Sequence, residues 1–67
     1  MIELEKLNGE TVILNADLIE FIEVTPDTLV TLTTGRKIMV RDSVDEVVQK
    51  VIKYRRFLHE GLSIKPE

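Results

Sequence analysis

Two tight turns, Asn8-Gly9 and Thr34-Gly35, constrain the fold of this chain more than any other feature. Apolar and polar residues alternate on both sides of each turn, over residues 2–14 and 28–40. A period of two is that of a half-buried β-strand, and Asn-Gly favours a two-residue hairpin loop because both positions tolerate positive φ. The sequence therefore predicts two antiparallel hairpins.

The segment between the hairpins, "NADLIEFIEV", allows two interpretations. Asn15 can cap a short helix, whereas the β-branched and aromatic residues that follow it favour a strand. A turn comes next at "TPDT", where Pro26 supplies a fixed φ and Asp27 a side-chain acceptor. We expect a strand at residues 18–24.

A helix start follows the second hairpin. Ser43-Val44-Asp45-Glu46 fits a capping box, in which the serine hydroxyl and the glutamate carboxylate each accept a hydrogen bond from a free backbone N–H. Because Gly61 is a typical helix stop, we predict one helix over residues 44–59. Its apolar residues recur at spacings of three and four, which places them in one stripe: Val44, Val47, Val48, Val51 and Leu58.

These elements predict an α+β fold: a small antiparallel β-sheet of four or five short strands, followed by one C-terminal amphipathic helix packed on one face. We expect residues 1–60 to form a single domain and residues 61–67 to form a tail that frays. The chain has 67 residues and no cysteine, so its core is small and no disulfide or zinc–thiolate site reinforces it. Association is the remaining way to enlarge the core, and we expect a homo-oligomer.

Phe57 does not fit the apolar stripe, because at about 100° per residue it projects roughly 130° from the stripe centre. One interpretation is that this flank of the helix, together with an exposed strand edge, contacts another protein. The alternative is that Phe57 packs against Leu62 and Ile64 of the tail. The first interpretation gives a candidate protein-interaction site of four residues: Ile52, Tyr54, Arg56 and Phe57.

Charge is divided unevenly along the chain, whose net charge is −3. Residues 1–30 carry seven acids and one base, whereas residues 31–67 carry eight bases and five acids. Such a chain can dock head to tail or present a basic face to an anionic partner. Arg36, Lys37 and Arg41 surround the second turn and could contact phosphates, but one basic turn is a weak signal for nucleic acid.

The sequence offers no catalytic constellation. Ser43 is better explained as a helix cap than as a nucleophile, and His59 as a partner of the helix dipole than as a general base. Glu20 and Glu23 would lie on opposite faces of a strand. One histidine without cysteine is a poor metal-ligand set, and the three glycines are too far apart for a phosphate loop. We expect no enzyme, no small-molecule substrate, no cofactor and no metal.

No apolar run approaches the roughly 20 residues that span a bilayer. The N-terminal stretch "MIELEKLNG" also lacks the basic-then-apolar plan of a signal peptide. We therefore expect no transmembrane segment and a cytoplasmic location.

The segment "IEFIEVTPDTLVTLTTGRKIMVRDSVDEV" resembles the strand-and-hairpin part of LytTR-type DNA-binding domains, in which short strands precede a helix in the same order. The resemblance covers under half of the chain and implies a nucleic-acid-binding module that regulates transcription. The net charge of −3 opposes this function, because phosphate-driven binding requires several lysine or arginine contacts. It is therefore the alternative to the resemblance that follows.

A second resemblance covers about three quarters of the chain, from Leu7 to Arg56. The pieces "LNG", "LNADLIE", "TPDT", "LTTGRK" and "VDEV" follow one another without insertion. In this order they resemble the FlbD/SwrD family of small bacterial flagellar proteins. The final stretch "FLHEGLSIKPE" lies outside the pattern.

The second resemblance implies a non-enzymatic motility factor, a small protein–protein adaptor that supports the output of the flagellar motor. It implies a motor or basal-body protein as partner, the membrane-embedded stator among the candidates, and a peripheral position at the flagellar base. It supplies no catalytic or ligand-binding residues that could be transferred to this chain.

Overall fold

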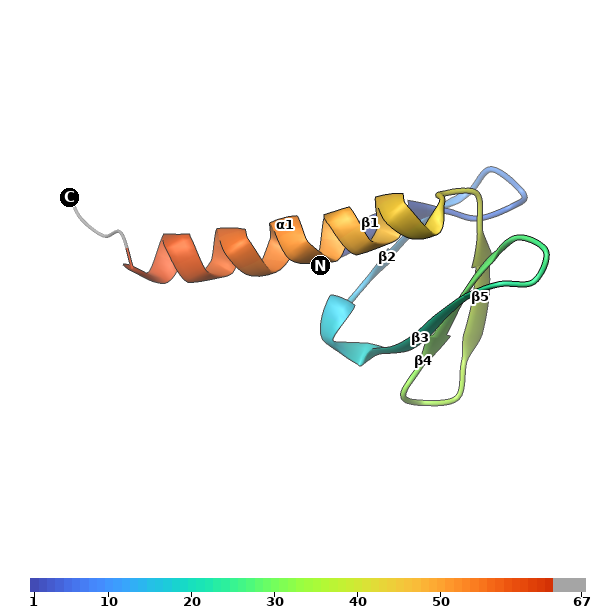
Figure 1. The fold of residues 1–67 in the computed structure, drawn as a ribbon, viewed down its shortest axis with the longest axis horizontal. Coiled ribbons are helices and arrows are strands. Elements are labelled where there is room, and N and C mark those ends of the chain that lie inside the picture. The colour runs from blue at the N-terminus through green and yellow to red at the C-terminus, as the bar shows by residue number, and fades with distance from the viewer. Residues whose placement is uncertain (64–67) are drawn as a thin grey trace.

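The computed structural model describes the backbone of residues 1–63 and the side chains of residues 1–59. Five strands and a short 3-10 helix precede one long helix (Figure 1). In chain order the elements are β1 (Ile2–Glu5), β2 (Thr11–Leu14), η1 (Ala16–Leu18), β3 (Ile19–Val24), β4 (Thr28–Leu32), β5 (Lys37–Val40) and α1 (Val44–Ser63).

Both predicted hairpins are present, but their loops are one residue longer than expected. Lys6 N donates to the carbonyl of Glu10 at 2.8 Å, which closes a three-residue loop, and Leu32 N does the same to Arg36 at 2.8 Å. Gly9 and Gly35 take the last loop position with φ of 91° and 93°. Glycine at that position is typical of a three-residue loop, because it adopts a left-handed conformation without steric cost.

The strands form two small antiparallel sheets instead of the single sheet that we predicted. β1 pairs with β2, and β4 lies between β3 and β5 in the second sheet. The sheets meet at a bridge between Lys6 and Val40, beside a hydrogen bond of 2.7 Å from Arg41 N to the carbonyl of Glu5. β2 and β3 do not pair because η1 turns the chain between them (Figure 1).

Around Asn15 the two interpretations of the sequence hold in succession. The side chain of Asn15 accepts a hydrogen bond of 3.0 Å from Asp17 N and caps η1. The predicted strand then begins at Ile19, so Leu18 belongs to η1 and not to the strand. The hydrogen bond to the Asn15 side chain thus outweighs the β-propensity of the sequence over the three residues of η1 only.

The helix begins as predicted. Glu46 N donates to Ser43 Oγ at 3.1 Å, and Ser43 N donates to Glu46 Oε1 at 2.7 Å, which is the reciprocal capping box. The predicted end is wrong, since α1 continues through Gly61 to Ser63. A glycine inside a helix costs about 1 kcal/mol relative to alanine, which weakens the helix without forcing it to stop.

The core lies between the two sheets and the first half of α1. Val30 and Val47 are completely buried, and Val51 and Tyr54 pack against the core from the helix. The buried apolar side chains come from β1, β2, η1, β4, β5 and α1: Ile2, Leu4, Leu14, Ala16, Val30, Leu32, Ile38, Val40 and Val47.

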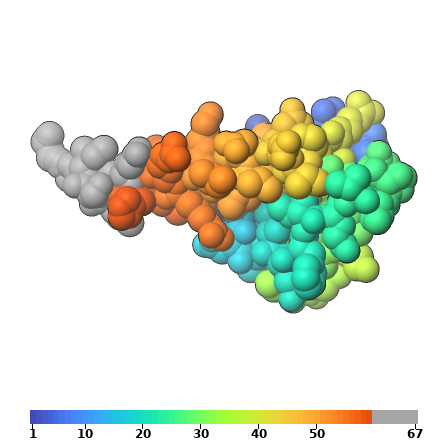
Figure 2. Space-filling model, viewed as in Figure 1, coloured from blue at the N-terminus to red at the C-terminus, as the bar shows by residue number. Residues whose placement is uncertain are grey.

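The predicted apolar stripe of the helix is only partly covered. Val47 is buried, whereas Val48 and Leu58 are exposed. Leu58 is exposed because the C-terminal half of α1 projects beyond the sheets (Figures 1 and 2). Residues 64–67, and the side chains of Leu62 and Ile64 that could have met Phe57, lie outside the described residues.

Candidate interaction surface

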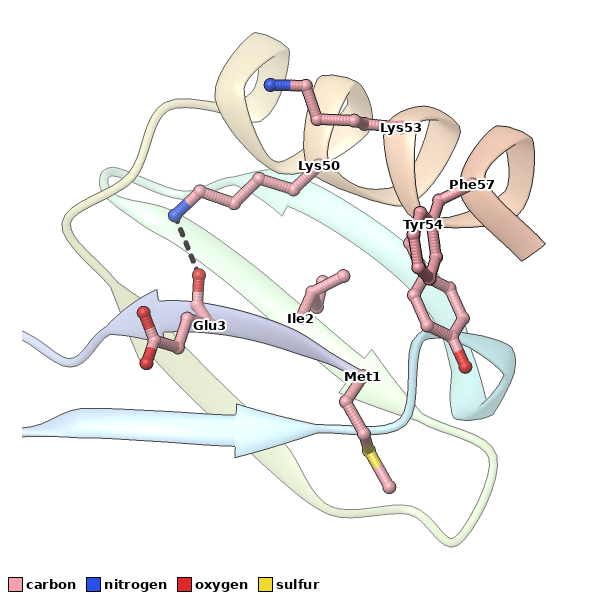
Figure 3. Close-up of a pocket in the computed structure, with 7 residues that line it drawn as sticks. All are labelled: Met1, Ile2, Glu3, Lys50, Lys53, Tyr54 and Phe57. Atoms are coloured by element: carbon pink, nitrogen blue, oxygen red, sulfur yellow. Dashed lines mark hydrogen bonds between the residues drawn. The ribbon is translucent and has the colours of Figure 1, made fainter. Parts of the chain in front are cut away.

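An apolar groove lies between the helix and the first strand. Its volume is about 640 Å³, and Figure 3 shows the start of the chain on one side and α1 on the other. Tyr54 is half-buried, whereas Phe57 is 69% exposed. The lining residues are Met1, Ile2 and Glu3 from the start of the chain and Lys50, Lys53, Tyr54 and Phe57 from the helix.

A smaller hollow of about 240 Å³ lies on the surface of α1 itself. Ile52 is its apolar member and is 42% exposed. The lining side chains all come from the helix: Gln49, Lys50, Ile52, Lys53 and Arg56. We call it the outer hollow.

The structure divides the four predicted interaction residues into two pairs. Tyr54 and Phe57 line the groove, whereas Ile52 and Arg56 line the outer hollow. Each pair is spaced by three or four residues, so its members share one side of the helix. Lys53 lines both hollows and joins the two sides. That this surface contacts a protein stays a prediction.

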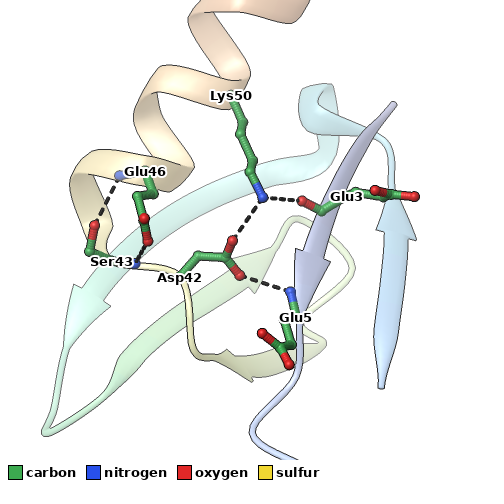
Figure 4. A network of polar contacts seen from close by, with 6 residues as sticks. All are labelled: Glu3, Glu5, Asp42, Ser43, Glu46 and Lys50. Carbon is green, nitrogen blue, oxygen red and sulfur yellow. Dashed lines mark hydrogen bonds and ion pairs between the residues drawn. The ribbon is translucent and has the colours of Figure 1, made fainter. Parts of the chain in front are cut away.

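Two side chains that the sequence analysis missed hold α1 against the first strand (Figure 4). Lys50 Nζ donates to Asp42 Oδ2 at 2.8 Å and to the carbonyl of Glu3 at 2.7 Å. Asp42 Oδ1 accepts from Glu5 N at 2.8 Å. These partners lie 8, 47 and 37 residues apart in sequence, so no local pattern indicates them.

The pKa of the Asp42 carboxyl lies below its usual value. Burial opposes ionisation and by itself would raise this pKa. Hydrogen bonds from Lys50, from the backbone of Glu5 and from the backbone of Asp42 itself outweigh burial, and the charge of Lys50 adds to them. Asp42 is therefore ionised at neutral pH, and its role is to position the helix.

Of the three cations around the second turn that could have contacted phosphates, Arg41 is bound within the fold. The Nε and Nη2 atoms of Arg41 donate to the carbonyl of Leu7 at 3.1 and 2.9 Å. Its guanidinium also lies 3.8 Å from the carboxylate of Glu5. Arg36 and Lys37 are exposed, and two lysine or arginine contacts are few for nucleic-acid binding.

The side chains weighed for catalysis do not converge. Ser43 is the helix cap, and His59 is exposed on the projecting part of α1. Within the described residues no group of three or more His, Asp or Glu side chains could hold a metal ion. No helix in that part of the chain is both long and apolar enough to cross a membrane.

The edge of the three-stranded sheet carries acidic and apolar side chains together. β3 is one of the two outer strands of this sheet, and within the described residues it pairs with β4 only. Glu20, Phe21, Glu23 and Val24 are all exposed on it. We call these four residues of β3 the acidic edge.

The fold and its surfaces define a small α+β protein with an apolar groove and a projecting helix. A family model described as flagellar and swarming motility proteins, FlbD, matches residues 1–59. The chain therefore belongs to the FlbD family, and the resemblance seen in its sequence is confirmed. No curated protein and no solved structure matches the chain.

Membership of this family assigns the chain to flagellar or swarming motility. The family match includes the whole sheet region and α1 as far as His59. It therefore includes all four predicted interaction residues and both sides of the groove.

Proposed function

We propose that this chain is a non-enzymatic adaptor that supports the output of the flagellar motor, bound peripherally at the flagellar base. One observation carries the proposal: in a motility protein, a long helix exposes apolar side chains that its own core does not cover, Ile52 on its outer side and Phe57 and Leu58 on the part that projects from the body. Exposed apolar side chains that gather on one element are typical of protein contacts.

The outer hollow is the surface assigned to the motor protein. Ile52 supplies an apolar centre, and Lys53 and Arg56 supply cations beside it. Arginine is one of the residues enriched at binding hot spots. The partner is expected to present carboxylates there, and the stator units and the basal-body proteins are the candidates.

The test is made in the bacterium that carries this chain. Deletion should lower swimming speed and motor torque while filaments remain. The variant Ile52→Ala/Arg56→Glu should reproduce this loss, and Ile13→Ala/Lys37→Glu is the matched control, because it makes similar changes at exposed residues of β2 and β5. Normal torque in both the deletion strain and the Ile52→Ala/Arg56→Glu strain would refute the proposal.

The partner is identified by a photo-crosslinking residue at position 56, with position 37 as the control. A stator or basal-body protein should be captured from position 56 and not from position 37. The alternative, regulation of transcription, predicts instead that the purified protein shifts duplex DNA with a steep salt dependence. A shift of this kind without a motor crosslink would replace the adaptor by the DNA-binding function.

A further inference from the structure

The apolar groove has a defined chemistry but no occupant within the described part of the chain. Ile2, Tyr54 and Phe57 form much of its wall, and Lys53 stands beside them. Lys50 also lines the groove, but its ammonium group is held by Asp42 and by the carbonyl of Glu3. The groove therefore fits a partner segment in which an apolar side chain has a carboxylate side chain as its neighbour.

Acidic and basic residues lie in different parts of the sequence, and the basic part contains the helical side of this groove. Residues 7–35 contain five acids and no base, whereas residues 49–59 contain four bases and no acid. Two of the four bases are paired within the chain, Lys50 with Asp42 and Arg55 with Asp17. The other two, Lys53 and Arg56, have no carboxylate within 4.0 Å among the described side chains.

The acidic edge has the complementary chemistry. Phe21 is 56% exposed and stands between Glu20 and Glu23 in β3. Neither of these carboxylates has a cation partner among residues 1–59. The outer side of β3 also has an open strand edge, which is a common site for association with another chain.

We infer that the groove of one copy receives the acidic edge of a second copy. Phe21 would enter the apolar groove beside Tyr54 and Phe57, and Glu23 would face Lys53. No β3 residue lines the groove of its own chain, so the edge fills only the groove of another copy. A 67-residue chain with a small core gains apolar burial from such a contact.

This inference concerns the free protein and does not depend on the proposed motor partner, so it is tested on purified chains. Sedimentation equilibrium over a concentration series should show the mean mass of the wild type rising above that of one chain. Association should weaken as salt is added, because exposed charges are screened over about 10 Å at 0.1 M salt. A wild type that stays a single chain at every concentration would overturn the inference.

Two variants locate the contact. The groove variant is Phe57→Ala/Lys53→Glu, and the edge variant is Phe21→Ala/Glu23→Lys. Each should associate at least roughly tenfold more weakly than the wild type, since truncation of an interface aromatic commonly costs this much. The matched control, Ile13→Ala/Lys37→Glu, should associate like the wild type. Equal association by all three variants would place the contact elsewhere.

Mixing the two variants gives the decisive result. The groove variant keeps an intact edge and the edge variant keeps an intact groove, so the mixture should form complexes that neither variant forms alone. Circular dichroism checks that both remain folded, and the single charge reversals Lys53→Glu and Glu23→Lys serve as a second pair should a double variant unfold. A mixture that contains only single chains would refute the pairing of groove and edge.

Discussion

Replacement of Asp42 tests how the helix is fixed to the sheets. Its side chain is only 12% exposed and accepts hydrogen bonds from two elements, Lys50 of α1 and the backbone of Glu5 in β1. Asp42→Ala removes both contacts and leaves the Glu5 N–H without its acceptor. Asp42→Asn keeps an oxygen for Glu5 N but removes the charge and the second oxygen, which accepts from Lys50 Nζ.

The two contacts contribute unequally. A hydrogen bond to a charged group contributes about 1.5–3 kcal/mol. The ion pair adds only about 0.2–1 kcal/mol, because the side chain of Lys50 is 41% exposed and solvent screens its charge. Asp42→Ala should therefore lower the free energy of unfolding by about 2–3 kcal/mol and Asp42→Asn by about 1 kcal/mol. At about 4–8 °C per kcal/mol, Asp42→Ala should lower the Tm by roughly 10–20 °C.

The pH dependence of the unfolding free energy separates the contribution of the Asp42 charge from that of the shape of its side chain. The pKa of Asp42 is lower in the folded chain than in the unfolded chain, so its ionised form stabilises the fold at pH values above the unfolded pKa of about 3.9. This stabilisation is lost as the pH falls through the folded pKa. The difference in unfolding free energy between wild type and Asp42→Asn should accordingly be largest near neutral pH and shrink in acid.

Urea denaturation followed by circular dichroism at a series of pH values measures this difference. Lys50→Met provides the second edge of a double-mutant cycle, which isolates the coupling between the two side chains. A wild type and an Asp42→Asn variant that differ by the same free energy at pH 7 and pH 3 would refute the reasoning. So would an Asp42→Ala variant as stable as the wild type.

Three further predictions concern single elements of the fold. Ser43→Ala should cost about 1 kcal/mol, because the capping hydroxyl for Glu46 N is lost, and urea denaturation measures it. Gly9→Ala should cost about 1–2 kcal/mol by the same assay although the space around Gly9 is open, because its φ is +91°. Val47 is completely buried, and Val47→Ala should destabilise the fold by about 2 kcal/mol. Leu58 belongs to the same stripe but is 40% exposed, so Leu58→Ala should cost under about 0.5 kcal/mol in dilute monomer. Equal losses for the two variants would mean that the projecting helix is covered within one chain.

Local patterns predicted the elements well, because each depends on residues that are neighbours in sequence. The capping box at Ser43 and the glycines of the two hairpins have short-range signals and were placed correctly. The division into two sheets could not be predicted in this way. It follows from the three residues of η1, whose cap Asn15 was recognised but was weighed as an alternative to the strand instead of as its neighbour.

The candidate site was predicted only in part, for a related reason. Helical spacing identified Phe57 as a side chain outside the stripe, but it could not show that Met1 and Ile2 form the opposite wall of a groove. It also could not show where the sheets end, so Leu58 was assigned to a covered stripe although it is exposed. Contacts between residues about 50 positions apart depend on the assembled fold and leave no periodic signal in the sequence.

The projecting helix follows from a mismatch of lengths. At about 3.3 Å per residue, strands of four to six residues are roughly 13–20 Å long, whereas a helix of 20 residues is about 30 Å long. The chain's own sheets can therefore cover only the first part of α1, although the apolar stripe continues to Leu58. An uncovered helical segment of about ten residues is marginally stable in water by itself. Whatever covers this segment should stabilise the helix as well as bind it, so that recognition and folding of the projecting half are coupled.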